Sequence, residues 1–321
     1  MVEIELKFQI SEARRTALLK ALDPKKSETI QLQAKYFDTP DRLLAQHGAA
    51  LRQRLEGACW IQTLKAAGKS HLHRFEHNHN LGELESSPEL DLSIYEAIPE
   101  AQQILTQALG VDAAALKLTF ETDIQRTYRV IQFEDAEIEV CLDVGVVRAS
   151  GREQTIHEVE FELKSGSVQS LLAFSFEWVK KYQLWLDVRS KAEMGNLLAL
   201  EQTVSPARFE KEFVLSKKES AAHNLSLLIG QQMQHLLPNI AAISAGVAEQ
   251  SHIDQAQTAL EHLQLTLALF KDWNSNISDK WAMQLAAFKH QFDHLQHLQH
   301  MQSTLGAFLQ NPTTTENLAK D

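Results

Sequence analysis

The feature that most constrains the fold is the alternation of charged and apolar residues in short segments of the first 200 residues. Segments 2–8 and 156–163 each read as β-strands, because every second residue is apolar. Side chains of a strand alternate between its two faces, so each strand would have one apolar and one charged face. The charged faces of these two strands carry Glu3, Glu5, Lys7, Glu158, Glu160 and Glu162.

The signs of these charges are segregated by strand. The acids fall in rows formed by Glu3/Glu5, Glu137/Glu139/Asp143 and Glu158/Glu160/Glu162. The bases form rows of their own, with Arg52, Arg54, Lys65, Arg74 and Arg126. One such strand alone is typical of a solvated sheet face, but neighbouring like charges destabilise a solvated face. Segregated rows instead predict one sheet that closes on itself, with charged faces inward and apolar faces outward under helices.

A row of carboxylates on one face requires cations. Two like charges 4 Å apart repel by about 4 kcal/mol at an effective dielectric constant of ~20. Oxygen ligands without cysteine or histidine favour Mg²⁺ or Mn²⁺ over zinc. Paired arginines match the oxygens of phosphate groups. Carboxylates, a divalent metal and a basic wall together predict a polyphosphate site.

The composition excludes several classes of protein. The 321 residues are 44% hydrophobic and carry a net charge of −11, which argues against a disordered chain and against nucleic acid or anionic membrane as a partner. Cys59 and Cys141 are too far apart to indicate a disulfide framework or a thiolate zinc site. The acidic start of the chain does not resemble a secretory signal, and apolar runs of ~20 residues are absent from the sequence. We therefore expect a cytoplasmic protein.

The pattern changes near Thr203–Pro206, where alternating segments give way to long helical ones. Helices are expected over 225–237, 256–273 and 280–309 in the second part, and over 11–22, 168–182 and 190–200 between the strands of the first. The sequence predicts an α+β first domain, residues 1–202, followed by a separate all-α domain, residues 203–321.

Several motifs of the first domain resemble a known family. Glu3-Ile4-Glu5-Leu6-Lys7 is similar to the E-x-E-x-K opening of the CYTH domain, the fold of the triphosphate tunnel metalloenzymes. Further CYTH-like motifs follow in the family's order and span residues 1–200. They are Tyr36-Phe37-Asp38-Thr39-Pro40, Leu51-Arg52-Gln53-Arg54, Thr63-Leu64-Lys65, Arg74-Phe75-Glu76, Leu142-Asp143, Glu158-Val159-Glu160-Phe161-Glu162-Leu163 and Ser190-Lys191.

This resemblance implies an eight-stranded antiparallel β-barrel with flanking helices, whose lumen binds triphosphate. The acids that resemble the family's Mg²⁺ or Mn²⁺ ligands are Glu3, Glu5, Asp143, Glu158, Glu160 and, as a supporting member, Glu162. The bases that resemble its triphosphate ligands are Lys7, Arg52, Arg54, Lys65, Arg74 and Arg126, with Arg189 and Lys191 at the helix that plugs one tunnel mouth. We assign catalysis to Glu5, Lys7 and Glu160, and which acid takes the proton from water stays open.

The second domain resembles part of another module. Bacterial inorganic triphosphatases join a CYTH domain to a helical CHAD domain, and segment 259–270 is similar to part of a CHAD helix. Residues 203–321 are about half of what a complete CHAD domain needs. The bases between 219 and 319 are Lys271, Lys280 and Lys289, so the arginines of a polyphosphate-binding face are missing. We therefore expect a truncated CHAD-like domain that does not bind polyphosphate.

A row of histidines lies in this second domain. His290, His294, His297 and His300 are spaced along one side of an expected helix. They could form a set of metal ligands. A polar helix face with a core stripe of Leu and Met beside it explains the same spacing, and we favour this interpretation.

The sequence thus predicts a metal-dependent hydrolase that cleaves inorganic tripolyphosphate to pyrophosphate and phosphate. One alternative keeps the site but acts on thiamine triphosphate or a nucleoside triphosphate, including the cyclising chemistry of class IV adenylyl cyclases. A second alternative is a non-catalytic polyphosphate-binding scaffold. Intact acids at every metal position favour an enzyme over a scaffold. The oligomeric state, the protein partners and the choice between Mg²⁺ and Mn²⁺ are not indicated by the sequence.

Overall fold

The computed structural model describes residues 2–70, 73–110, 116–272, 279–290, 292–294 and 301, with backbone alone for 2, 3, 69, 70, 73 and 74. The chain divides into two compact units, Met1–Ser205 and Pro206–Asp321. The predicted domain boundary, after residue 202, lies three residues before this division. The two units are described separately below.

The first unit is built on one antiparallel sheet of nine strands in the order β5-β4-β3-β2-β6-β7-β8-β1-β9. The strands are β1 (Val2–Gln9), β2 (Glu28–Asp38), β3 (Ala49–Glu56), β4 (Cys59–Ser70), β5 (His73–Glu83), β6 (Lys117–Phe133), β7 (Ala136–Ala149), β8 (Arg152–Ser165) and β9 (Trp185–Leu186). The prediction of eight strands missed β9, which has two residues and is too short to show an alternating pattern.

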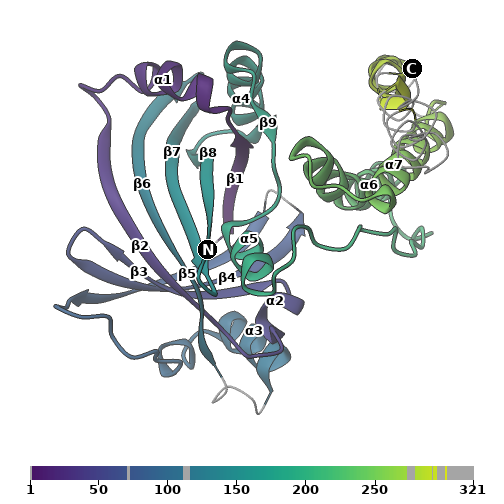
Figure 1. The fold of residues 1–321 in the computed structure, drawn as a ribbon. Coiled ribbons are helices and arrows are strands. Elements are labelled where there is room, and N and C mark those ends of the chain that lie inside the picture. The colour runs from purple at the N-terminus through teal and green to yellow at the C-terminus, as the bar shows by residue number, and fades with distance from the viewer. Residues whose placement is uncertain are drawn as a thin grey trace, which may run out of the picture. The chain divides into compact units, whose positions relative to one another are not determined.

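Strand β1 has strand neighbours on both sides. It pairs with β8 over Glu5–Gln9 and with β5 at Val2, Glu3 and Ile4. Figure 1 shows that the sheet is strongly curved, with α1 and α4 lying near one end of strands β6, β7 and β8. The sheet therefore has a concave and a convex face.

Two groups of helices cover the apolar faces of the strands. Helices α1 (Glu12–Ala21) and α4 (Val168–Tyr182) pack on β1, β7 and β8. The buried side chains of this contact include Phe8, Leu18, Phe161, Leu171 and Phe174. The Ser167 hydroxyl caps α4 by accepting a hydrogen bond from the Ser170 backbone N–H. The apolar half of each alternating strand thus packs against a helix, as the sequence predicted.

The second group covers strands β3, β4 and β5. It contains α2 (Leu43–Gln46), the 3₁₀ turn η1 (Ser93–Tyr95) and α3 (Pro99–Leu109). Asp38, from a CYTH-like motif, holds α2 in place. Its buried carboxylate accepts hydrogen bonds from the backbone N–H groups of Thr39, Leu44 and Ala45. This acid therefore has a structural role, which its position in the motif did not reveal.

Helix α5 (Lys191–Ala199) lies on the opposite face of the sheet, the face that carries the charged rows. Its Met194 is buried against Ile124, Val147 and Ile156 of β6, β7 and β8. The Ser190 hydroxyl accepts a hydrogen bond from the Glu193 backbone N–H and caps the helix. This arrangement brings the first residue of α5, Lys191, to the charged rows.

The second unit contains α6 (Ala221–Ser244), α7 (Gln250–Leu269) and helical residues 279–290. Its core includes Leu236, Ala256, Leu260 and Leu263. In the portions of the chain that the structure describes, no helix is long and apolar enough to cross a membrane. Of the histidine row, His290 and His294 are helical, whereas His297 and His300 lie outside the described residues.

Candidate metal and anion site

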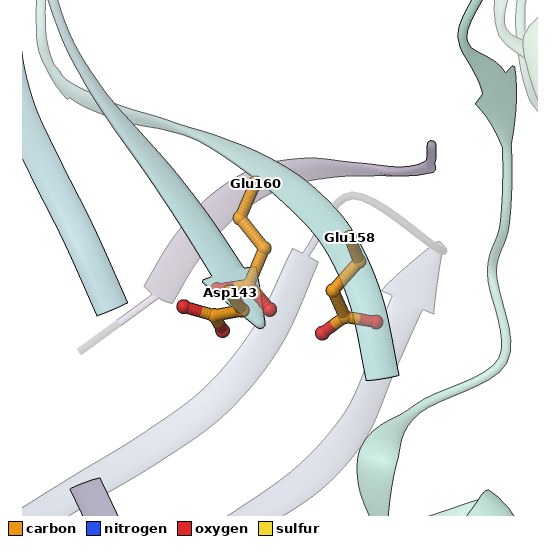
Figure 2. Close-up of side chains that lie close together, drawn as sticks. All are labelled: Asp143, Glu158 and Glu160. Atoms are coloured by element: carbon orange, nitrogen blue, oxygen red, sulfur yellow. The ribbon is translucent and has the colours of Figure 1, made fainter. Parts of the chain in front are cut away.

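Three acids gather on the charged face where β7 and β8 run side by side. Asp143 pairs with Glu158 in register, and Glu160 lies two residues further along β8. One oxygen from each carboxylate lies within 4.8 Å of the others, and Figure 2 shows the three side chains on one side of these strands. Asp143 and Glu158 are completely buried, and the Glu160 side chain is 15% exposed. We call Asp143, Glu158 and Glu160 the acid cluster.

The ammonium group of Lys191 contacts every member of the acid cluster. Its Nζ lies 2.8 Å from Asp143 Oδ2 and 2.8 Å from Glu160 Oε1, and it also forms an ion pair with Glu158 Oε1. Although burial lowers it, the three surrounding carboxylates raise the pKa of Lys191 well above its ordinary value. Lys191 therefore carries its charge into a largely buried site.

A second cation, Arg126 of β6, binds the acid cluster through two carboxylates. Its Nε and Nη2 each lie 2.7 Å from an oxygen of Asp143, in the two-pronged arrangement that guanidinium and carboxylate favour. Nη2 also lies 2.5 Å from Glu160 Oε2. Arg126, which was predicted as a ligand of triphosphate, holds two acids of the cluster in this structure.

The three carboxyl groups differ in their acidity. Burial raises the pKa of each, but Lys191 and Arg126 outweigh it at Glu160 and hold its pKa well below the ordinary value. Arg126 and Lys191 likewise lower the pKa of Asp143. At Glu158 burial dominates and raises the pKa, despite Lys191 and Lys7 nearby. Glu160 and Asp143 are thus anions at neutral pH. Glu158 is the member of the acid cluster whose pKa its neighbouring cations do not lower below the ordinary value.

Lys7 of β1 approaches the acid cluster from the neighbouring strand. Its Nζ lies 3.4 Å from Glu158 Oε2 and donates a hydrogen bond to the Arg189 carbonyl oxygen. The guanidinium of Arg189 pairs with Asp187, with Nη2 2.7 Å from Oδ2. Asp187 in turn donates its backbone N–H to the Lys7 carbonyl oxygen over 3.0 Å. The segment before α5 therefore fixes Lys7 beside the acids.

A second group of bases lies on the same face of β3 and β4. Lys65 Nζ lies 2.6 Å from Glu76 Oε2, and Arg52 Nη2 lies 4.0 Å from Glu76 Oε1. Arg54 pairs with Glu56 of its own strand. Glu56 and Glu76 were not among the predicted site residues. The sequence contained a signal for both, because Glu56 lies two residues after Arg54 and Glu76 two residues after Arg74, on the same face of the strand as these bases.

Tyr36 of β2 lies beside the bases of β3, on the same face of the sheet. Its register partner on β3 is Arg52, and its ring stacks on Phe120 with centroids 4.4 Å apart. Burial raises the pKa of the Tyr36 hydroxyl, but the nearby charge of Arg52 reverses this and lowers it. Burial, together with Arg52, lowers the pKa of Arg54 to about 10. Bases packed this closely form a site that favours an anion with several charges.

The acid cluster has the properties of a divalent metal site. Its donors are all carboxylate oxygens, the type that Mg²⁺ and Mn²⁺ favour. Both oxygens of Glu158 are buried, and each faces an ammonium group, Oε1 that of Lys191 and Oε2 that of Lys7. A buried carboxylate is stable as an anion only beside a cation, so this residue is suited to a cation as its ligand. The residues present therefore fit a divalent metal.

The remaining predicted site residues lie outside the acid cluster. Glu162 pairs with Lys164, whose Nζ is 2.9 Å from Glu162 Oε1. Glu5 faces Glu162 in the register of β1 and β8. Glu3 and Arg74 are register partners on β1 and β5, and their side chains lie outside what the structure describes. The structure thus gathers Asp143, Glu158 and Glu160, whereas Glu162 pairs with Lys164 instead.

Comparison with known proteins assigns the first unit to a family. The family model of the CYTH domain matches residues 1–195. An inorganic triphosphatase from Haemophilus influenzae is 33% identical over 227 residues, which cover 68% of this chain and 62% of that protein. The chain therefore spans less than two thirds of the length of this relative.

Two solved structures are also similar. A candidate adenylate cyclase from Bacillus halodurans matches with a TM-score of 0.45 and 22% identity, over 60% of this chain and 96% of that one. A candidate adenylyl cyclase from Hippeastrum, described as having a dominant triphosphatase activity, matches with a TM-score of 0.45 and 18% identity, over 63% of this chain and 97% of that one. Both scores are low, so the family assignment rests on the family model.

Proposed function

The chain belongs to the CYTH domain family, and we propose that it is a metal-dependent hydrolase of a linear triphosphate. Its substrate would be inorganic tripolyphosphate, cleaved to pyrophosphate and phosphate. The observation that carries the proposal is the pairing of a buried acid cluster with a wall of bases on one face of one sheet. The inorganic triphosphatase of Haemophilus influenzae supports the choice of substrate.

The bases would bind the phosphate chain. Arg52, Arg54 and Lys65 belong to neighbouring strands. Arg52 and Lys65 lie beside Glu76, and Arg54 pairs with Glu56. A triphosphate carries more charge than these carboxylates and would draw the guanidinium groups to itself. Arg74 and Arg189, also predicted as substrate ligands, would extend this wall. Binding by several fixed cations holds the terminal phosphate in one orientation for attack.

The acid cluster would hold the metal, with Asp143, Glu158 and Glu160 as its ligands and the predicted Glu3, Glu5 and Glu162 in support. A bound Mg²⁺ or Mn²⁺ supplies charge neutralisation on the phosphate oxygens. Lys7 is held beside Glu158 and can orient an incoming water or a phosphate oxygen by hydrogen bonding. Glu160 and Asp143 stay ionised at neutral pH, so they bind cations well and are weak bases.

Three features of the wider molecule belong to the same proposal. The pairing of β1 with β5 supports closure of the sheet into a tunnel, because it joins strands from the two ends of the order β5 to β1. The second unit would be a CHAD-like helical domain. We expect the protein in the cytoplasm, with neither nucleic acid nor membrane as its partner.

Two alternatives to a tripolyphosphatase are an enzyme with another triphosphate substrate and a non-catalytic scaffold. Thiamine triphosphate or a nucleoside triphosphate would bind the same bases through its phosphates, and a cyclase would release pyrophosphate from ATP. A non-catalytic polyphosphate scaffold would need the bases but not the acids. The buried acid cluster favours an enzyme, since ionised carboxylates repel a polyanion unless a metal lies between them.

The experiment that tests the proposal measures phosphate release from tripolyphosphate with Mg²⁺, with Mn²⁺ and with a chelator. The wild-type protein should turn over with either metal and stop when the metal is removed. Glu160→Gln should lower kcat by about 100-fold or more, because it removes a metal ligand. Glu153→Gln is the matched control on the same strand, where Glu153 pairs with exposed Arg148. Equal activity of Glu160→Gln and Glu153→Gln would contradict the proposed site.

A further inference from the structure

Lys191 stands at the centre of the acid cluster. It takes one oxygen from each of the three acids, Asp143 Oδ2, Glu158 Oε1 and Glu160 Oε1. A metal ion held by this cluster would likewise take one oxygen from each residue. Arg126 binds differently, because it holds both oxygens of Asp143 and the other oxygen of Glu160. The ammonium group therefore lies among the same three carboxylates that would hold a metal.

An ammonium and a divalent metal cannot share this position. Mg²⁺ binds carboxylate oxygens at about 2.0–2.1 Å, well inside the reach of an ammonium hydrogen bond. Two cations drawn to the same three oxygens would lie within a few ångströms of each other. The site is buried, with Asp143 and Glu158 fully inaccessible, so solvent would screen their repulsion weakly.

We propose that Lys191 is a built-in counter-ion of the acid cluster, which holds the cluster together in the metal-free protein and is displaced when a divalent cation binds. The inference rests on the metal dependence in the proposed function and not on the identity of the substrate. It predicts that metal affinity is set by competition with a side chain of the protein itself.

The exchange requires the Lys191 side chain to move but not helix α5. The helix is fixed by its Ser190 cap and by Met194, which is buried on the sheet. Lysine has a flexible four-carbon stem, so its ammonium can leave the acids while its backbone stays in place. Lys191 also influences the charge state of Tyr36, the partner of Arg52, so it lies within electrostatic reach of the proposed phosphate-binding bases.

This exchange would couple the two halves of the site. A displaced ammonium on the same face adds one positive charge to the wall that receives the triphosphate. Bound triphosphate would in turn hold Lys191 away from the acids and strengthen metal binding. Metal and substrate should therefore each increase the affinity for the other, as linkage requires.

The test is calorimetric titration of the metal-free full-length protein with Mn²⁺, without substrate. Lys191→Met should bind Mn²⁺ about tenfold or more tightly than the wild type, since the competing buried ion pairs are gone. Lys26→Met is the matched control, because Lys26 is an exposed lysine that pairs with Asp23 and with no member of the acid cluster in the described structure, and its affinity should equal that of the wild type. Equal affinities of Lys191→Met and the wild type would overturn the inference.

A second measurement uses the wild type alone and does not depend on how Lys191→Met folds. Amine acetylation followed by mass spectrometry should show Lys191 protected without metal and several-fold more reactive at saturating Mn²⁺, with the reactivity of Lys26 unchanged. Unchanged reactivity of Lys191 would contradict the exchange. Mn²⁺ binding to neither the wild type nor Lys191→Met would contradict the inference and the metal dependence together, whereas phosphate release tests the hydrolase separately.

Discussion

At the scale of single residues, the site is a balance between three acids and the cations that surround them. Glu160 contacts Arg126 and Lys191, whereas Glu158 lies beside Lys7 and Lys191. The sequence predicted repulsion among the carboxylates of each row. In the metal-free protein this repulsion is offset at Glu160, because Glu160 has two cationic partners.

The first residue-scale prediction concerns acid stability. A carboxyl group whose pKa is lowered on folding stabilises the fold above its unfolded pKa, and this contribution is lost as the pH falls below it. Glu160 and Asp143 are such groups, so the free energy of unfolding of the metal-free protein should fall as the pH drops below about 4.5. Urea unfolding between pH 7 and pH 3 measures it.

Two variants separate the acids in this experiment. Glu160→Gln should be less stable than the wild type at pH 7 and should lose part of its acid dependence. Glu158→Gln should keep the acid dependence, because the Glu158 pKa is raised and its charge does not favour the fold. Loss of the acid dependence of unfolding in Glu158→Gln, and its retention in Glu160→Gln, would contradict the pKa directions given for these two acids.

The second residue-scale prediction concerns Arg54, whose pKa of about 10 shows that its charge is disfavoured by burial and by Arg52. Arg54→Met should leave the free energy of unfolding unchanged or raise it, because a base with a lowered pKa destabilises the fold while it is charged. Its KM for tripolyphosphate should rise by about tenfold or more. Arg148→Met, an exposed position on β7, is the control. Steady-state kinetics that leave KM unchanged would remove Arg54 from the site.

At the scale of secondary-structure elements, alternating patterns predicted where the strands lie in the sequence. They did not predict which side chains of different elements come into contact. The period of two identified most of the strands, because one face of each strand packs on helices. It could not place Arg126 against Asp143, since the pairing of β6 with β7 depends on the register of the whole sheet. Nor could it bring Lys191 into the acid cluster, because that contact needs α5 to lie on the charged face. Helix α3 (Pro99–Leu109) was not predicted at all.

The element-scale prediction tests how firmly α5 is seated. A Cβ added at Gly195 of α5 would lie 2.1 Å from the Phe120 ring, which is itself stacked on Tyr36. Gly195→Ala should therefore lower the free energy of unfolding by about 1–3 kcal/mol. Gly230→Ala is the matched change in α6, where the added Cβ meets nothing within 4 Å, and it should stabilise by about 0.5–1 kcal/mol. Chemical unfolding of both variants gives the comparison, and a harmless Gly195→Ala would contradict the close packing of α5.

At the scale of the whole molecule, the acid cluster and both groups of bases lie within the first of the two units. The sequence predicted this division from the change in pattern near residue 203. Charge totals were a poor guide to the ligand, because a chain with a net charge of −11 still has a wall of bases on one sheet. What the sequence could not indicate is the use of cations within the acid cluster itself, since those contacts join residues far apart in the chain.

The whole-molecule prediction follows from that division. A protein truncated after Ser205 should fold and retain phosphate release from tripolyphosphate within about tenfold of the full chain. Circular dichroism checks the fold, and phosphate release checks the site. Loss of activity in a well-folded truncated protein would mean that residues 206–321 contribute to the site.

The proposed hydrolysis of a linear triphosphate with a divalent metal is tested by comparing kcat/KM across substrates. Purified full-length protein with Mg²⁺ or Mn²⁺ is assayed for kcat/KM on tripolyphosphate, ATP, thiamine triphosphate and pyrophosphate. We predict the highest kcat/KM for tripolyphosphate and no turnover without metal. A higher kcat/KM for ATP or thiamine triphosphate would contradict the proposed substrate. Turnover of none of the four compounds would contradict the proposal that the protein is a hydrolase.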